Sequence, residues 1–144
     1  MDIQIIEGHN NNTQVIIQCE KVNEEILRLR SYIDLFHFRM KARLDQKTVF
    51  VELSEVLYFE SVDNRTFLYT AEAVLEIKHK LYELEELLPS EDFFRSSKSQ
   101  IVNINQIKAL APGFNRTLFA IMSNGEQVYI SRKYATTLRN LLSI

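Results

Sequence analysis

Residues 93–104 read FFRSSKSQIVNI, in which a polar segment separates a pair of aromatic residues from an apolar end. A loop would explain the three serines and a strand would explain the apolar end. Neither explains why the polar segment contains Arg95 and Lys98 and no acidic residue. We therefore predict that residues 95–99 form a short, stiff anion-binding loop whose two ends are fixed in the core. The predicted anchors are Phe93, Phe94, Ile101 and Val102.

The composition is that of a soluble globular chain: 144 residues, 46% hydrophobic, 25% charged, with three glycines and two prolines. No stretch reaches the roughly 20 apolar residues that a membrane helix needs, and the first residues do not resemble a signal peptide. The single cysteine, Cys19, excludes an internal disulfide framework and fits a reducing compartment. These features predict a cytoplasmic protein that is not inserted into a membrane.

The net charge of −2 conceals an asymmetry along the chain. Residues 1–92 contain 18 acids and 10 cations, a balance of −8, whereas residues 93–144 contain 7 cations and only Glu126, a balance of +6. Such asymmetry favours a surface that faces a polyanion. It is equally compatible with basic loops that fold back against the acidic half.

Hydrophobic periodicity predicts a chain of many short strands with helices at the margins. We expect strands over residues 2–7, 14–18, 37–44, 48–53, 56–60, 66–70, 74–79, 107–110, 118–122 and 127–130. We expect helices over residues 23–34, 80–88 and 131–142. Asn23 and Ser131 are the predicted N-caps of the first and last helix. Inward faces are predicted at Leu81, Leu84 and Leu88, and at Tyr134, Leu138 and Leu141.

The change of period near residues 36–45 predicts a boundary between two parts. Residues 1–37 would form a strand-helix extension, and residues 38–144 a β-rich domain. On the extension, Val22, Ile26, Leu29 and Ile33 fall on one helical face. This stripe is a candidate dimer or regulator-binding face, or it covers the sheet of the chain's own domain.

A search for catalytic and metal-binding patterns gives no support to an enzyme. The three glycines are isolated, so no glycine-rich phosphate loop exists. His9, His37 and His79 share no metal-ligand spacing with one another or with Cys19. No serine is marked as a nucleophile beside a base. We therefore predict no catalytic activity, no metal and no cofactor.

Four cationic sites in the chain are flanked by short hydrogen-bonding residues. Phosphate oxygens only accept hydrogen bonds, so a surface that binds them combines Arg or Lys with hydroxyls and free backbone N–H groups. The start of a helix adds a favourable dipole for an anion. The candidate residues are Arg65 and Thr66, then Arg95, Ser97, Lys98 and Ser99, then Arg116, and finally Ser131, Arg132 and Lys133. Together they favour nucleic-acid binding.

The same segments, in the same order, resemble the LytTR DNA-binding domain of bacterial transcription regulators. They are VLYFESVDNRTFLYT (56–70), LYELEELL (81–88), FFRSSKSQIVNINQIKAL (93–110) and NGEQVYISRKYATTL (124–138). The resemblance covers roughly residues 38–144. Its most specific parts are the aromatic-aromatic-arginine run with its serine and asparagine, and the serine-arginine opening of the last helix.

The resemblance implies a mainly β fold with short helices (α+β), an elongated stack of small antiparallel sheets. It also implies that loops, not a recognition helix, enter successive major grooves of double-stranded DNA. Carried over by position, Lys98 and Lys133, with Arg65 or Thr66, would contact bases. Ser99, Ser131, Arg132 and Arg116 would contact phosphates. Asn103 is expected to be structural, its amide satisfying the turn after Val102.

One position departs from the family, because many members have His where Ser97 stands. Residues 1–37 are too few for the phospho-receiver domain of most members, so we expect a stand-alone regulator. Abundance or a partner protein would then control it. The expected partners are double-stranded DNA and a second copy on repeated half-sites. The alternative function is a protein-interaction module or anti-regulator on the same β-rich scaffold, which would not shift DNA at low salt.

Overall fold

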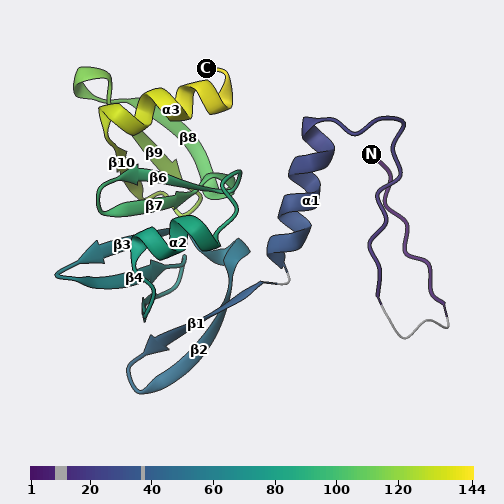
Figure 1. Cartoon of the computed structure of the whole chain (residues 1–144), viewed down its shortest axis with the longest axis horizontal. Coiled ribbons are helices and arrows are strands. Elements are labelled where there is room, and N and C mark those ends of the chain that lie inside the picture. The colour runs from purple at the N-terminus through teal and green to yellow at the C-terminus, as the bar shows by residue number, and fades with distance from the viewer. Residues whose placement is uncertain (9–12, 37) are drawn as a thin grey trace.

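The computed structural model of the chain describes residues 1–8, 13–36 and 38–144. Figure 1 shows a β-rich body, helix α1 beside it, and the N-terminal residues beyond α1. The helices are α1 (Glu24–Phe36), α2 (Leu81–Leu87) and α3 (Arg132–Leu142). The strands are β1 (Arg39–Leu44), β2 (Lys47–Glu52), β3 (Tyr58–Val62), β4 (Arg65–Tyr69), β5 (Val74–Ile77), β6 (Phe93–Ser97), β7 (Gln100–Asn103), β8 (Ile107–Pro112), β9 (Leu118–Met122) and β10 (Gln127–Ile130). This confirms a mainly antiparallel β fold with short helices.

The described strands form two sheets in which every pairing is antiparallel. The larger sheet has seven strands in the order β2-β1-β5-β4-β3-β7-β6, and the smaller has three in the order β10-β9-β8. The register Tyr58↔Tyr69 and Thr66↔Ile77 fixes which side chains of the large sheet share a face. A one-residue slip would turn the apolar set outward, so burial of that set holds the register.

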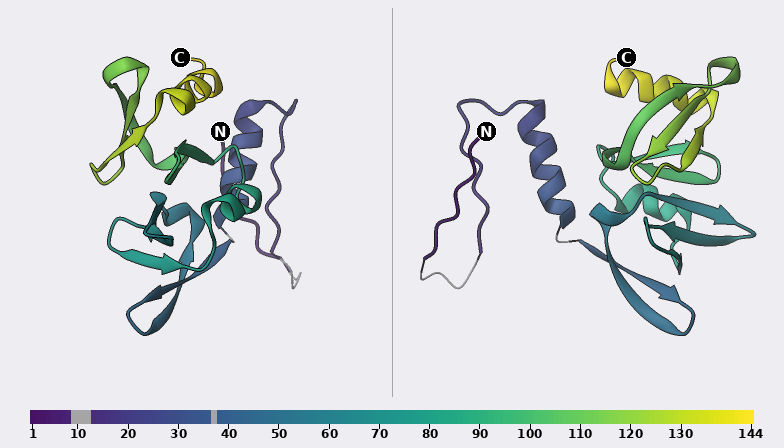
Figure 2. Two further views of the ribbon diagram at one scale, coloured as in Figure 1. Left: turned by 60° about the vertical axis from the view of Figure 1, so that its left-hand side comes forward. Right: turned by 180° about the vertical axis from the view of Figure 1, so that it is seen from behind.

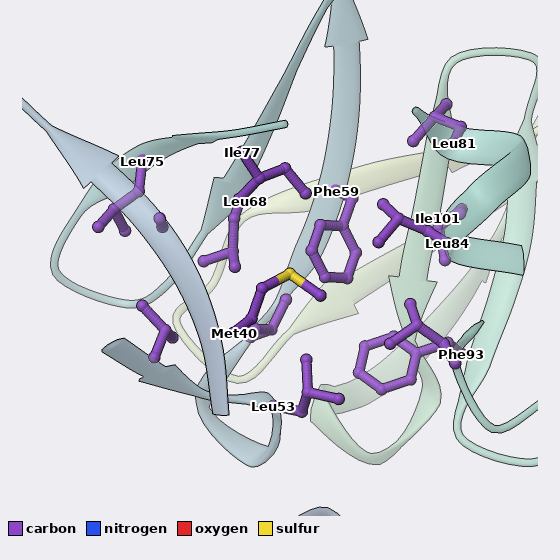
Figure 3. Close-up of a cluster of buried hydrophobic side chains, with 14 residues drawn as sticks. Met40, Leu53, Phe59, Leu68, Leu75, Ile77, Leu81, Leu84, Phe93 and Ile101 are labelled. Carbon is purple, nitrogen blue, oxygen red and sulfur yellow. The ribbon is translucent and has the colours of Figure 1, made fainter. Parts of the chain in front are cut away.

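One core lies between the large sheet and α2 (Figure 3). Phe59 and Leu68 are fully buried, and the Phe59 and Phe93 rings meet with centroids 5.9 Å apart. The predicted inward face of α2 is confirmed, since Leu81, Leu84 and Leu88 are 6%, 0% and 5% exposed.

A second core joins the two sheets beneath α3. Val102 and Phe94 reach it from β7 and β6, while Ala135 and Leu138 reach it from α3. The four predicted anchors of the 93–104 segment are confirmed, because none of them is more than 8% exposed. The expected inner face of α3 is only partly correct: Leu138 is buried, Tyr134 is half-buried, and Leu141 is 51% exposed.

Two polar predictions are decided by hydrogen bonds. Asn103 is fully buried; its Nδ2 donates to Val56 O at 2.8 Å and its Oδ1 accepts from Asn105 N at 3.0 Å. This confirms its structural role. Asn23 Oδ1 accepts from Ile26 N at 3.0 Å, as expected for an N-cap. Ser131 occupies the N-cap position of α3, as predicted, but its side chain makes no capping hydrogen bond.

The expected bounds of the folded strands are close to those observed. Strands β9 and β10 match the prediction residue for residue, and β1 to β5 and β8 shift by one or two residues at one or both ends. Strands β6 and β7 were not among the predicted strands. In β1, Met40 and Ala42 are buried as expected, whereas Leu44 is 38% exposed. Phe38, just before the strand, is 43% exposed. His37, the expected first residue of this strand, lies outside the described residues.

The two predicted N-terminal strands are wrong. Residues 1–8 and 13–22 form no strand, although they run side by side in both views of Figure 2. Among these residues the structure shows no backbone–backbone hydrogen bond. Neither segment packs into a core, and Ile5 and Ile6 are 92% and 87% exposed. An isolated pair of extended segments is marginally stable, which accounts for the missing ladder.

Helix α1 contacts the body through a short polar chain. Arg28 Nη2 donates to Asn105 Oδ1 at 2.5 Å, and Asn105 Nδ2 donates to Asp92 Oδ1 at 2.6 Å. Asp92 is 2% exposed, and its burial raises the pKa of its carboxyl. No helix in the described ranges is both long and apolar enough to cross a membrane.

Candidate nucleic-acid interface

The turn between β3 and β4 presents Arg65 at its end. Asp63 and Asn64 have φ of 51° and 63°, the left-handed conformation that a tight hairpin requires and that Asp and Asn tolerate. The Arg65 guanidinium binds Glu76 of β5 through two hydrogen bonds of 2.5 and 3.2 Å. It also lies 5.2 Å from the centroid of the Phe67 ring. Arg65 therefore lies on the outer face of the large sheet, held by a carboxylate.

Glu76 is shared between two arginines. Arg43 of β1 donates to it at 3.1 Å, in addition to the two bonds from Arg65. These bonds lower the pKa of Glu76 to about 2, the hydrogen bond from Arg65 being the largest cause. A carboxyl whose pKa falls on folding contributes stability above its ordinary pKa and loses it as the pH falls toward 2. Glu76 is therefore ionised at every pH at which DNA binding would be measured.

Thr66 points to the opposite face. It is 2% exposed, and its Oγ1 has no hydrogen-bond partner among the described residues. This placement argues against a base contact from Thr66, and Arg65 remains the candidate at this turn.

The β6–β7 hairpin carries the predicted anion loop, in a shape that differs from the expected exposed loop. Ser96 is fully buried, and the register shifts between Arg95 and Ser97, which indicates a bulge. The exposed tip is short and consists of Lys98 and Ser99, with Ser97 half-buried beside them. Ser97 Oγ accepts from Ser99 N at 3.3 Å and stiffens this tip.

Arg95 supports the tip of the β6–β7 hairpin. Its side chain is only 18% exposed and forms an ion pair with Glu85 of α2. It donates to Ser97 O at 2.7 Å and to Lys98 O. The segment itself contains no acid, but the fold supplies one from α2. Arg95 thus holds the backbone that displays Lys98.

The start of α3 presents Arg132 and Lys133, both exposed. The Lys133 Nζ lies 5.3 Å from the centroid of the Tyr134 ring. Ser131 is half-buried, and its hydroxyl is not used as a cap. These residues open an 11-residue helix, whose first N–H groups and dipole favour an anion.

Backbone hydrogen bonds connect these three elements. Ser61 N, in β3, donates to Ser99 O at 2.8 Å, and Ser131 N donates to Ser96 O at 2.9 Å. In Figure 1 the β3–β4 turn, the β6–β7 turn and the start of α3 lie on one side of the molecule. We call this surface the loop edge and define it by Arg65, Lys98, Ser99, Ser131, Arg132 and Lys133.

Arg116 is not part of this connected set. It lies in the turn between β8 and β9, with φ of 64°, and it is exposed. Its carbonyl accepts from Arg139 Nη1 of α3 at 3.3 Å. Within the described ranges no hydrogen bond joins Arg116 to the loop edge.

The sequence prediction did not include two lysines that lie next to the loop edge. Lys80 Nζ donates to Asn64 O at 2.6 Å, which places it at the β3–β4 turn. Lys78 is exposed and directly follows Ile77, which pairs with Thr66, the residue after Arg65. The sequence signal for these two lysines was the run Lys78-His79-Lys80. That run was predicted only as the end of a strand and the start of a helix.

The bracing role of Arg95 gives a testable expectation. Arg95→Ala should keep the fold but weaken DNA binding roughly tenfold, because the tip must then be ordered on binding, at about 0.5–1.5 kcal/mol per side chain. DNA titration by fluorescence anisotropy, with circular dichroism as the check on folding, measures this. Arg95→Lys keeps the charge but cannot span two carbonyls, so full recovery in that variant would contradict the bracing role. Glu85→Gln, which removes only a partly exposed pair, should have little effect.

A metal centre finds no support in the described part of the chain. No group of three or more His, Cys, Asp and Glu side chains there could hold a metal ion.

Comparisons with known proteins identify the family and the fold. The family model of the LytTr DNA-binding domain matches residues 46–143. A solved LytTr DNA-binding domain from Bacillus cereus superposes with a TM-score of 0.71 at 36% identity, over 74% of this chain and 97% of that one.

Full-length relatives are of two kinds. The sensory transduction protein LytT of Bacillus subtilis is 28% identical over 91% of this chain, and that of Bacillus anthracis is 35% identical over 70%. The chain spans only 54% and 41% of these two proteins. An uncharacterised HTH-type transcriptional regulator of Staphylococcus aureus is 27% identical over 96% of this chain and 95% of its own length.

The fold and the family match define a β-rich DNA-binding domain. In the described chain, strands separate α1, α2 and α3 from one another, so no two of them form a helix-turn-helix. The chain belongs to the LytTR family of DNA-binding domains.

Proposed function

We propose that this LytTR chain is a transcription regulator that binds double-stranded DNA through the loop edge in a sequence-specific way. The observation that carries the proposal is the connection of three cationic elements by backbone hydrogen bonds. Such a surface keeps its cations at fixed separations, so the phosphate contacts fix its orientation and a few side chains can reach base edges.

The proposed roles follow the exposure of each residue. Lys98 and Lys133, both exposed on tips, are assigned to base edges, together with Arg65. Ser99, Ser131 and Arg132 are assigned to phosphates, with Arg116 at the margin. Arg95 and Ser97 support the tip, and Lys78 and Lys80 add positive charge beside Arg65. The proposal contains no catalytic step and no cofactor.

We further propose that the protein acts in the cytoplasm and binds repeated half-sites as a homodimer. A regulatory partner protein is a further proposed means of control. Two linked copies would lengthen the site and raise the affinity through effective concentration.

The test of DNA binding is its dependence on salt. Affinity for the upstream DNA of the chain's own gene should fall linearly in a plot of log K against log salt, with a slope of about −0.9 for each phosphate contacted. Competition with unrelated DNA of equal length measures specificity. Absence of a mobility shift at low salt would favour the alternative function, a protein-interaction module or anti-regulator.

Glu76 should act as an internal competitor of DNA for Arg65. Glu76→Gln removes the carboxylate that holds Arg65, so we expect DNA binding at low salt to strengthen roughly twofold to tenfold. The gain should be larger on cognate DNA than on unrelated DNA, because Arg65 is assigned to a base edge. Glu72→Gln is the matched control, because it removes an exposed acid from the β4–β5 turn that pairs with no cation in the described structure. Equal affinity of the two variants would contradict this role of Glu76.

A further inference from the structure

The N-terminal part of the chain exposes far more apolar surface than a monomer usually does. In residues 1–8 and 13–36, nine large apolar side chains are between 48% and 92% exposed. They are Met1, Ile3, Ile5, Ile6, Val15, Ile16, Val22, Leu27 and Tyr32. We call residues 1–8 and 13–22 the arm. At on the order of 100 Å² each, these side chains together approach the about 800 Å² that each partner buries in a stable complex.

The arm also has unused backbone hydrogen-bonding groups. Residues 1–8 and 13–22 are extended, yet among the described residues they make no backbone–backbone hydrogen bond. Extended apolar segments with free N–H and C=O groups pair with another extended segment. The free backbone groups of the arm are therefore suited to pair with an extended apolar segment.

A groove between the arm and α1 is open to such a partner. It has a volume of about 380 Å³ and is lined by Val15 and Ile17 of the arm and by Ile33 of α1. Thr13, Arg30 and Asp34 complete its rim. Ile33 belongs to the apolar stripe of the first helix, which the sequence left either as a dimer or regulator-binding face or as a cover for the chain's own sheet. In the structure Ile33 faces this groove, so at that position the stripe faces the arm.

The geometry points to a second copy of this chain as the occupant: we infer that two arms pair and form the dimer interface. Each copy offers both an extended apolar segment and a groove that accepts one, which is the self-complementarity that a two-fold interface requires. The arm interface would explain how the proposed homodimer forms. Only the statement that the dimer spans two half-sites rests on the proposed function.

The position of the arm is compatible with DNA binding. In Figure 1 the arm and the loop edge lie on opposite sides of the β-rich body, with α1 between the body and the arm. A second copy could therefore join without covering the loop edge. The polar chain from Arg28 through Asn105 to Asp92 fastens α1 to the body, so a dimer formed by the arms would hold two bodies at a defined separation.

The experiment uses the full chain without DNA. Sedimentation equilibrium should show a dimer for the wild type, and the double variant Ile5→Glu/Ile16→Glu should raise the monomer–dimer Kd by about 100-fold or more, since a buried interface would have to accept unpaired charges. Phe50→Glu is the matched control. Phe50 is 58% exposed on β2, the strand at the edge of the large sheet. This control should remain dimeric.

The single native cysteine gives a second readout. Cys19 is exposed and lies in the arm, so a spin label there places one probe on each chain. Dipolar coupling between labels should appear in the wild type and disappear in the double variant. A wild type that is monomeric and shows no dipolar coupling would overturn the inference. The arm would then be a binding site for another protein. Dimer loss in Phe50→Glu alone would overturn it in favour of the sheet edge.

DNA binding separates this inference from the proposed function. The Ile5→Glu/Ile16→Glu variant should bind a single half-site as the wild type does, and should lose only the gain in affinity for two half-sites. If neither the wild type nor the double variant binds any DNA while the wild type is a dimer, the proposed function is wrong and the arm interface is still supported.

Discussion

The double variant Lys98→Ala/Lys133→Ala is expected to lose sequence-specific DNA binding. Each lysine is exposed at the tip of one element of the loop edge, and a good base contact is worth about 1–3 kcal/mol. The summed loss is about 2–6 kcal/mol, enough to bring specific binding close to non-specific binding. Titration of cognate and scrambled DNA at one fixed salt concentration measures this loss.

The control for that variant is Lys41→Ala/Lys47→Ala. It removes two exposed lysines of the β1–β2 hairpin and changes the net charge by the same amount. In Figure 1 this hairpin forms the lower end of the β-rich body, below the β3–β4 turn, and neither lysine belongs to the loop edge. Equal losses in the two double variants would show that only total charge matters and would refute the assignment. Because Ser131 N binds Ser96 O, the two tips are coupled, and the single variants need not sum to the double.

Phe59→Ala should give the largest loss of stability. The ring is fully buried, contacts Phe93, and sits in the middle of β3, which pairs with both β4 and β7. Removal of a buried phenylalanine costs about 3–5 kcal/mol. We expect a fall of the thermal midpoint by at least roughly 10 °C, measured by scanning calorimetry.

Phe50→Ala is the paired measurement for that variant. It makes the same chemical change at a position that is 58% exposed, and it should shift the midpoint little. A similar shift in the two variants would mean that the core does not depend on Phe59. DNA binding by Phe59→Ala below its midpoint should remain, since Phe59 does not reach the loop edge.

The sequence predicted the body better than it predicted the N-terminal part. Strands β9 and β10 are short apolar segments joined by a turn in which Gly125 has φ of 90°, so local signals determine their bounds. The arm has comparable apolar segments in residues 2–7 and 14–18, yet the structure shows no strand there. An apolar segment of this length could form a strand. It does not show that a pairing partner is present in the same chain.

At the loop edge, the sequence identified the cations but not their partners. Arg95 stood in a run free of acids, and only the fold brings Glu85 to it from α2. Thr66 and Arg65 are adjacent in sequence, but strand pleating sends them to opposite faces. Lys80 is near Asn64 because α2 begins beside the β3–β4 turn, a contact between residues 16 apart. Such pairings depend on tertiary structure and could not be predicted from local patterns.

The two hydrogen bonds that join the elements of the loop edge, Ser61 N to Ser99 O and Ser96 O to Ser131 N, use only main-chain atoms. Any residue except proline at positions 61 and 131 can donate them, so they place no demand on the side chains at the tips. The residues that would face a base can therefore change while the frame that holds them stays the same. A protein built in this way could acquire a new DNA site by substitutions at Lys98 and Lys133 alone.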